Sequence, residues 1–310
     1  SAHDMTLESE GEIPYPMYWD TRDSSNGDFS DLVRVDEQSI KLFQDMINET
    51  YRNIWTRDRK KHNARNSRVP SRYQVVTAFR SENSKLWREY GVRRAQLIQD
   101  AASLAEQGGQ AYALYSDVKS TNGWVKHGGM LADRLKPECN EWYLFHGTTP
   151  KAAESICRND FNLNRAGSCT GTLYGRGIYF AESITKADEY SKPNENGEYA
   201  VILARVVGGN VHYIDAIEPD PEECLQSCIE GPYDCILGDR EKCRNTFREF
   251  VFYDTENFFA EYIIHYRRIY ERSSERASSK DVYERRASER AASKEVFERS
   301  SSKEGAAAGG

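Results

Sequence analysis

The chain has 310 residues, 29% of them charged, and a formal net charge of −7 at neutral pH. This acidic balance argues against a protein whose main role is to coat nucleic acid, because the phosphate backbone attracts basic surfaces. No apolar run approaches the ~20 residues needed to cross a bilayer, which predicts a soluble protein with no membrane partner.

The beginning of the chain, Ser1-Ala-His-Asp-Met5, has no basic or apolar segment typical of a signal peptide. It also lacks an initiator methionine, so we expect a piece of a longer protein. Seven cysteines, an odd number, occur without such a signal. We therefore expect reduced thiols and an intracellular location, either nuclear or cytoplasmic.

The first 140 residues are expected to open with a disordered segment, residues 1–12, which is acidic and has few apolar anchors. β-Branched and aromatic runs then alternate with apolar residues at helical spacing. Glycines leave residues 110–140 without a clear assignment. The predicted strands cover residues 32–35 and 73–79, and the predicted helices cover residues 40–51 and 83–98.

Residues 57–72 contain seven basic residues and one acid, Asp58. Such a run has two interpretations, a patch for nucleic acid or nuclear import and a solvated loop. The run contains no stacking aromatic side chain, which favours the loop.

The second half of the chain mixes strands and capped helices. Thr149 before Pro150, Ser183 before Ile184, and Asp220 before Pro221 are typical helix starts. Strands and helices do not alternate regularly, so an α+β fold is favoured over a doubly wound sheet. The predicted strands cover residues 141–147, 178–181, 200–207, 211–214, 247–253 and 261–266.

After residue 272 the composition changes. Residues 274–287 recur as residues 288–301, a repeat of 14 residues with too few apolar positions for a coiled-coil seam. Residues 273–310 are therefore expected to form a disordered, low-complexity tail. The folded part is expected to be one domain over residues 13–272, with an N-terminal part to residue 140 and a core from residue 141.

The stretch from Gly175 to Tyr190 contains a glycine turn, a short apolar strand and a helix. Tyr179 on the strand and Tyr190 on the helix frame a small volume floored by glycine backbone. This arrangement predicts a slot for a flat ring, and ordinary core packing of two tyrosines is the alternative.

Three polar residues, His146, Tyr179 and Glu261, stand at ends of predicted strands, and each alone has an ordinary structural explanation. Three stretches around them are informative together. Leu144-Phe-His-Gly-Thr-Thr149, Tyr174-Gly-Arg-Gly-Ile-Tyr-Phe-Ala181 and Glu261-Tyr-Ile-Ile264, in this order and spacing, resemble the catalytic domain of the poly(ADP-ribose) polymerase family of ADP-ribosyltransferases.

This resemblance implies two small antiparallel sheets that form a split β core with NAD in the cleft between them. NAD would be a substrate, no metal would be needed, and ADP-ribose would pass to protein side chains, with the chain itself as one candidate acceptor. A catalytically silent scaffold that binds NAD or ADP-ribose, and a transferase that acts on nucleic-acid ends, are the alternatives.

The resemblance also implies roles for single residues. His146 would hold the adenosine ribose, and the backbone of Gly147 would bond the nicotinamide carboxamide. Tyr190 would stack on the nicotinamide ring, with Tyr179, Thr148 and Ala187 also lining the pocket. Glu261 would bond the nicotinamide-ribose 2′-OH and stabilise positive charge on the sugar.

Two features limit what the resemblance implies. Ala187 stands where the family usually has a serine that bonds the carboxamide. A glutamate at position 261 permits polymer formation without establishing it.

A zinc site among Cys224, Cys228, Cys235 and Cys243 is disfavoured, because the first two are spaced four apart rather than as a zinc knuckle.

Overall fold

The computed structural model describes residues 13–23, 25, 27–109, 111–128, 135–163 and 173–271. The chain divides into two compact units, residues 1–268 and 269–310, and the second is described only over residues 269–271. The segment 1–12 and the tail 273–310 lie outside the described residues. In the described part of the chain, no helix is long and apolar enough to cross a membrane.

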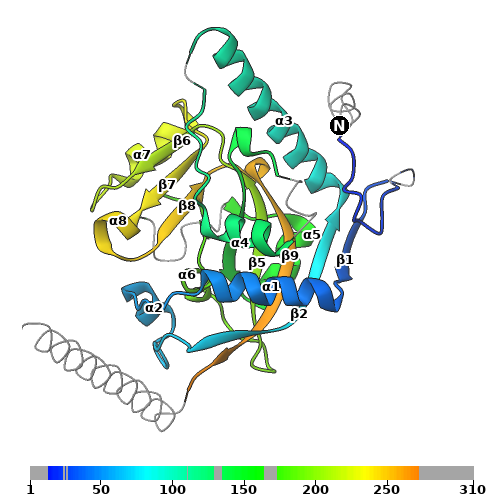
Figure 1. Ribbon diagram of the computed structural model, residues 1–310, viewed down its shortest axis with the longest axis vertical. Coiled ribbons are helices and arrows are strands. Elements are labelled where there is room, and N and C mark those ends of the chain that lie inside the picture. The colour runs from blue at the N-terminus through cyan, green and yellow to red at the C-terminus, as the bar shows by residue number, and fades with distance from the viewer. Residues whose placement is uncertain are drawn as a thin grey trace, which may run out of the picture. The chain divides into compact units, whose positions relative to one another are not determined.

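The centre of the first unit is a nine-stranded sheet, counted over the described residues, with the order β1-β2-β9-β5-β3-β4-β8-β7-β6 (Figure 1). Strands with a recorded register pair antiparallel, apart from the parallel pair β6 and β7. This mixture confirms the α+β prediction. The strands are β1 (Ser30–Arg34), β2 (Arg72–Asn83), β3 (Glu141–Thr148), β4 (Ile178–Ala181), β5 (Tyr199–Val207), β6 (Val211–Ile214), β7 (Cys235–Asp239), β8 (Arg248–Phe252) and β9 (Phe258–Ile269).

The sheet narrows to a seam between β3 and β4. These two strands pair at a single position, Phe145 with Ala181, whereas β3 pairs with β5 at eight positions and β4 with β8 at four. The seam separates one half, β1-β2-β9-β5-β3, from the other, β4-β8-β7-β6. The two halves expected from the resemblance are therefore present, but one pair of residues joins them into a single sheet.

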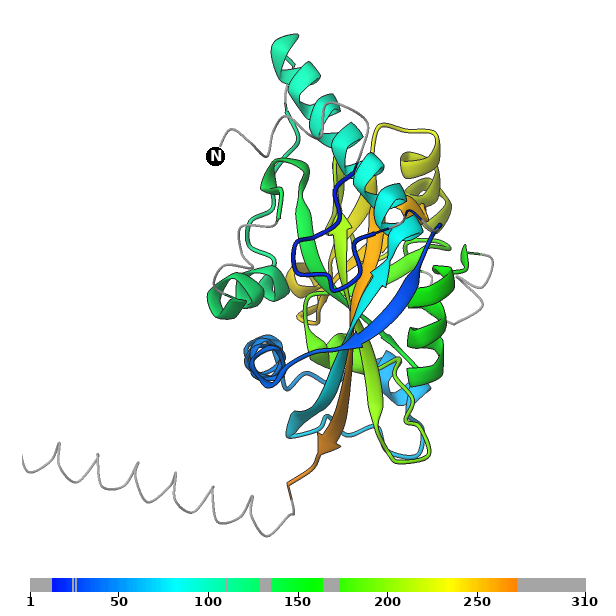
Figure 2. The same ribbon diagram turned by 90° about the vertical axis from the view of Figure 1, so that its right-hand side faces the viewer.

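Helices cover both faces of the sheet, and Figure 2 shows α1 and α4 on one face and α5 on the other. One apolar core lies between the sheet and α5, and a second lies between the sheet and α1 with α4. Because β5 is buried on both faces, it is an unbroken apolar run in the sequence. The helices are α1 (Glu37–Thr50), α2 (Arg57–His62), α3 (Ser84–Glu106), α4 (Lys119–Gly128), α5 (Pro150–Asn159), α6 (Ile184–Asp188), α7 (Pro221–Ile229) and α8 (Arg240–Arg244), with 3₁₀ turns η3 (Pro137–Cys139) and η5 (Thr255–Asn257).

Two of the three expected helix caps are present. Thr149 accepts a hydrogen bond from the backbone N–H of Ala152 at 3.1 Å, and Asp220 caps the first turn of α7 in the same manner. Ser183 stands before α6, but its hydroxyl donates to the carbonyl oxygen of Thr50 at 2.7 Å and makes no cap bond. The prediction of a Ser183 side-chain cap was therefore wrong, because a tertiary contact uses the hydroxyl.

The basic segment 57–72 is not simply a solvated loop. It begins with helix α2, whose Arg59 is fully buried. Arg59 makes an ion pair with Asp188 at 2.9 Å and donates to the carbonyl oxygen of Thr185 at 2.7 Å. These partners offset the cost of burying the guanidinium, which composition alone could not predict.

Candidate active site

His146 lies on β3 at the seam, where its ring packs against Phe161 and Phe180 at centroid distances of 5.0 and 5.5 Å. Its Nδ1 lies 2.9 Å from the carbonyl oxygen of Tyr179. A carbonyl can only accept a hydrogen bond, so Nδ1 donates and Nε2 keeps its lone pair. Burial lowers the pKa of His146, opposed by this hydrogen bond, so the imidazole is neutral near pH 7.

Gly147 and Thr148 are the last two residues of β3. They follow Phe145, the residue of β3 that pairs with β4. A Cβ at Gly147 would overlap the carbonyl oxygen of Ala187, so only glycine allows α6 to approach this closely. Ala187 is buried on α6, and Thr148 is half-buried. The close approach places the main chain of Gly147 directly beside α6.

Tyr179 lies on β4 and is held by the turn that precedes it. Its hydroxyl donates to the carbonyl oxygen of Gly175 at 2.9 Å and accepts from the N–H of Tyr174 at 3.0 Å. Ala181, two residues further along β4, pairs with Glu249 of β8. Because side chains alternate along a strand, Tyr179 and Glu249 project from the same face of this half of the sheet.

Lys186 links α6 to β8 through its ammonium group. Its Nζ lies 3.0 Å from Oε1 of Glu249, 3.2 Å from Oε2 of Glu189 and 3.3 Å from the hydroxyl of Tyr190. Burial by itself lowers the pKa of Lys186, but Glu249 and Glu189 more than compensate and raise it well above the usual value. Lys186 is therefore a permanent cation that holds the Glu249 carboxylate next to Tyr190.

Glu261 does not join this group. Its carboxylate accepts hydrogen bonds from the hydroxyls of Tyr18 at 2.5 Å and Tyr143 at 2.8 Å, and pairs with Arg205 at 3.0 Å. It is fully buried on β9, which β5 and β3 separate from the β4 strand that carries Tyr179. Three strand spacings amount to about 14 Å. The expectation that Glu261 would converge on one cleft with His146, Tyr179 and Tyr190 was therefore wrong.

Glu249 and Lys186 are the residues that sequence reasoning missed at this site. Two predicted strands carried a glutamate followed by apolar residues, Glu249-Phe-Val-Phe252 and Glu261-Tyr-Ile-Ile264. The sequence pattern alone marks both glutamates as candidate catalytic residues. What separates them is the sheet order, in which β8 is the neighbour of β4 and β9 is not.

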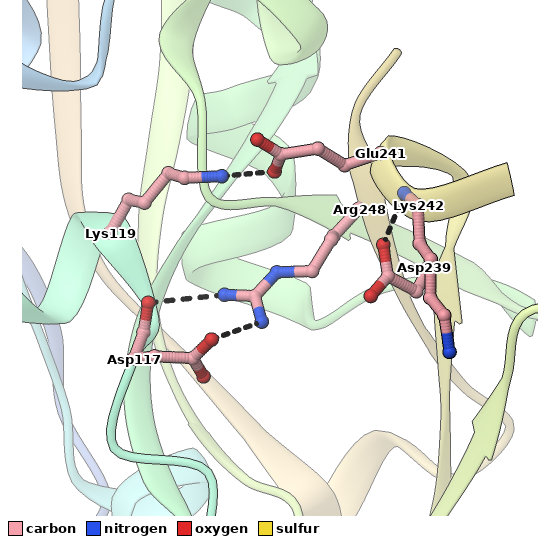
Figure 3. Close-up of a pocket in the computed structure, with 6 residues that line it drawn as sticks. All are labelled: Asp117, Lys119, Asp239, Glu241, Lys242 and Arg248. Carbon is pink, nitrogen blue, oxygen red and sulfur yellow. Dashed lines mark hydrogen bonds and ion pairs between the residues drawn. The ribbon is translucent and has the colours of Figure 1, made fainter. Parts of the chain in front are cut away.

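A charged pocket of about 490 Å³ lies at the start of β8, next to Glu249 along the chain. Figure 3 shows Arg248 reaching Asp117 in this pocket, and Lys119 reaching Glu241. Arg248 also makes two bonds, of 2.8 and 2.7 Å, to the carboxylate of Glu182, the residue after β4. The pair of Arg248 and Glu182 attaches the beginning of β8 to the end of β4, next to Glu249.

The described cysteines of the second half are not arranged as metal ligands. Among the residues that the structure describes, no group of three or more His, Cys, Asp or Glu side chains could hold a metal ion. Cys224, Cys228, Cys235 and Cys243 are free. Burial raises the pKa of Cys224 to about 11 and that of Cys228 to about 12, so both are thiols at neutral pH.

Comparison with known proteins gives one family and several relatives. A model of the poly(ADP-ribose) polymerase catalytic domain matches residues 48–227, more than half of the chain. Mouse protein mono-ADP-ribosyltransferase PARP10 is 42% identical over 84 residues, covering 25% of this chain and 9% of the relative.

Two further relatives extend this likeness. The Caenorhabditis elegans poly [ADP-ribose] polymerase tankyrase is 33% identical over 104 residues, covering 33% of this chain and 5% of that protein. Human protein mono-ADP-ribosyltransferase PARP12 is 25% identical over 263 residues, covering 83% of this chain and 28% of that protein. The chain thus spans less than a third of the length of each of these relatives.

Proposed function

This chain belongs to the poly(ADP-ribose) polymerase catalytic domain family, and we propose that it is an NAD-dependent ADP-ribosyltransferase. NAD is a substrate in this proposal: the bond between nicotinamide and ribose breaks, and ADP-ribose passes to side chains of acceptor proteins, with the chain itself as one candidate. The relatives named mono-ADP-ribosyltransferase and poly [ADP-ribose] polymerase support this reaction. The free cysteines of the described part support an intracellular setting, nuclear or cytoplasmic.

The observation that carries the proposal is the meeting of an imidazole, two phenol rings and a carboxylate around the seam. The neutral His146 has an acceptor at Nε2 that suits a hydroxyl of the adenosine ribose. Tyr190 offers a ring on which nicotinamide can stack, and Tyr179 forms the pocket wall. The main chain of Gly147 bonds the carboxamide, with Thr148 and Ala187 beside it.

We assign the catalytic carboxylate to Glu249 in place of Glu261. Departure of nicotinamide builds positive charge on the ribose, as in glycoside hydrolysis. A carboxylate fixed beside the sugar stabilises that charge, and it can also accept a proton from an acceptor hydroxyl. Glu249 is held 3.0 Å from Lys186, next to Tyr190, whereas three donors already occupy the carboxylate of Glu261.

The activity is tested by incubating the chain with labelled NAD alone, with a protein mixture, and with RNA or DNA ends. We expect label on protein and release of nicotinamide, and the length of the attached chain on a gel separates mono- from poly-ADP-ribosylation. Label on nucleic acid alone, or NAD binding without any turnover, would contradict the proposal.

The catalytic carboxylate is tested with Glu249→Gln, which keeps the shape of the side chain and removes its charge. We expect kcat to fall by about 10²–10³ with NAD still bound, because this is the typical cost of losing one preorganised charged group. Glu256→Gln, a change to an exposed glutamate of η5, is the matched control. Full activity of Glu249→Gln would show that the carboxylate acts elsewhere.

A further inference from the structure

Helix α2 brings another carboxylate to the lysine of the candidate site. Oδ2 of Asp58 lies 2.8 Å from Nζ of Lys186 and 3.2 Å from the hydroxyl of Tyr190. The Lys186 side chain is only 7% exposed, whereas that of Asp58 is 38% exposed. Asp58 therefore lies at the rim of the site, in contact with the same ammonium that holds Glu249.

Three contacts, two of them buried, keep α2 in this place. Arg59 is anchored by Asp188 at 2.9 Å, and the Thr56 hydroxyl donates to Glu189 at 2.6 Å. The side chain of Asn63 donates to the carbonyl oxygen of Glu189 at 2.7 Å. Because all three contacts reach the segment 188–189 next to Lys186 and Tyr190, the position of Asp58 is built into the fold.

The last residue of α2 also contacts the site. The ring of His62 lies against the ring of Tyr190, with a centroid distance of 4.7 Å and an angle of 49° between the planes. Asp58 and His62 are four residues apart and so project from one face of the helix. One face of α2 therefore contacts both Lys186 and Tyr190, and its exposed residues Arg57, Lys60 and Lys61 lie outside that contact.

The charges around Lys186 do not balance. Its ammonium lies within 3.2 Å of three carboxylates, those of Asp58, Glu189 and Glu249. One positive charge shared among three negative ones leaves the group net negative, even though Arg59 approaches Glu189 at 3.8 Å. If Asp58 lost its charge, the ammonium would neutralise the remaining two carboxylates, Glu249 among them, more completely.

We propose that Asp58 is a positioning residue of the NAD site, which shares the Lys186 ammonium with Glu249 and so preserves negative charge on Glu249 for the positive ribose of the transition state. Asp58 acts through Lys186 and does not itself touch the reacting atoms. This inference rests on the proposed ADP-ribosyl transfer. It assigns to α2, at the start of the basic segment, a part in catalysis that the sequence did not indicate.

The test is Asp58→Asn, which keeps a hydrogen-bonding oxygen and removes the charge. We expect kcat for transfer from labelled NAD to fall by about tenfold, since the lost charge supports the transition state. The KM for NAD, the Kd for nicotinamide by calorimetry and the Tm should stay close to wild type, because neither ring stacking nor the Arg59 anchor changes. Asp58→Glu should restore most of kcat, and Asp100→Asn on α3 is the control for an aspartate outside the site.

The outcomes separate this inference from the function on which it rests. A wild-type chain with no transfer and no NAD cleavage overturns the proposed function and the inference with it. An active wild type with full kcat in Asp58→Asn overturns the inference alone. Parallel losses of kcat, nicotinamide binding and Tm would mean that Asp58 only holds α2 in place, which also overturns it.

Discussion

Two glutamates twelve positions apart illustrate how the same side chain takes different roles. Glu249 pairs with Lys186 at 3.0 Å, and the same ammonium lies 3.3 Å from the hydroxyl of Tyr190. Glu261 is enclosed by Tyr18, Tyr143 and Arg205 and is fully buried. Three donors already hold the Glu261 carboxylate, so it has little remaining capacity to accept from a substrate hydroxyl.

We predict that Glu261→Gln destabilises the fold. Removing this charge leaves Arg205 in a buried site with a weaker partner, Glu141 at 3.4 Å, and should lower the free energy of unfolding by about 3 kcal/mol. Urea denaturation measures the loss. The fraction that remains folded should keep the kcat of wild type, and a stable but inactive variant would return the catalytic role to Glu261.

A second prediction concerns Ala187, which stands where the family usually has a serine. Ala187 is buried on α6, and its carbonyl oxygen lies beside Gly147, whose main chain we propose bonds the carboxamide. Ala187→Ser should add one hydrogen bond to nicotinamide, worth on the order of 1 kcal/mol, and so lower the KM for NAD several-fold. Steady-state kinetics checks this, and an unchanged KM would argue against the placement of the carboxamide.

Among the elements, β8 is held in place by side chains as well as by backbone pairing. It pairs with β4 at four positions, and Arg248 at its start binds Glu182 at the end of β4. Both side chains are nearly buried, with exposed fractions of 8% and 2%. The pair therefore fixes the strand that carries Glu249 against the strand that carries Tyr179.

We predict that Arg248→Met lowers both stability and activity. It leaves the buried Glu182 carboxylate with Lys119 as its remaining cation, and breaking a buried pair in this way typically costs about 3–5 kcal/mol. Thermal and urea unfolding measure the loss. The double variant with Glu182→Met should recover part of it, and a double variant less stable than the sum of the single changes would refute this account.

For the whole molecule, histidines whose pKa is lowered by burial predict how stability depends on pH. Burial lowers the pKa of both His146 and His265. In the unfolded chain these groups take up protons near pH 6.5, so on acidification the unfolded state binds more protons than the folded state. Stability contributed by the neutral rings is therefore present at pH 7.5 and is lost as pH falls below 6.5.

The expected change is a decrease of about 1–2 kcal/mol in the free energy of unfolding between pH 7 and pH 5.5. Urea titrations at fixed temperature across this range measure it. His265→Gln should flatten the slope, because one of the histidines with a lowered pKa no longer titrates. A stability that rises on acidification in this window would show that the rings are charged in the folded chain.

Much of the secondary structure followed from local physics. The caps at Thr149 and Asp220 and the apolar run of β5 were identifiable because each depends on neighbours along the chain. The α2 segment was misjudged, because the partner of Arg59 is Asp188, more than a hundred positions away. Composition shows that the segment is basic, but it does not show which acidic residues form ion pairs with the segment in the folded chain.

The sequence by itself determined the α+β class, the family and most of the side chains that gather at the seam, since short motifs and strand periodicity depend on residues close together in the chain. Only the tertiary structure decided that β8 rather than β9 lies beside β4, that Lys186 joins Glu249 to Tyr190, and that Asp58 reaches the same ammonium. The reason is physical: strand order and ion pairing are set by contacts between segments far apart in sequence, and no local pattern encodes which of two similar strands becomes the neighbour.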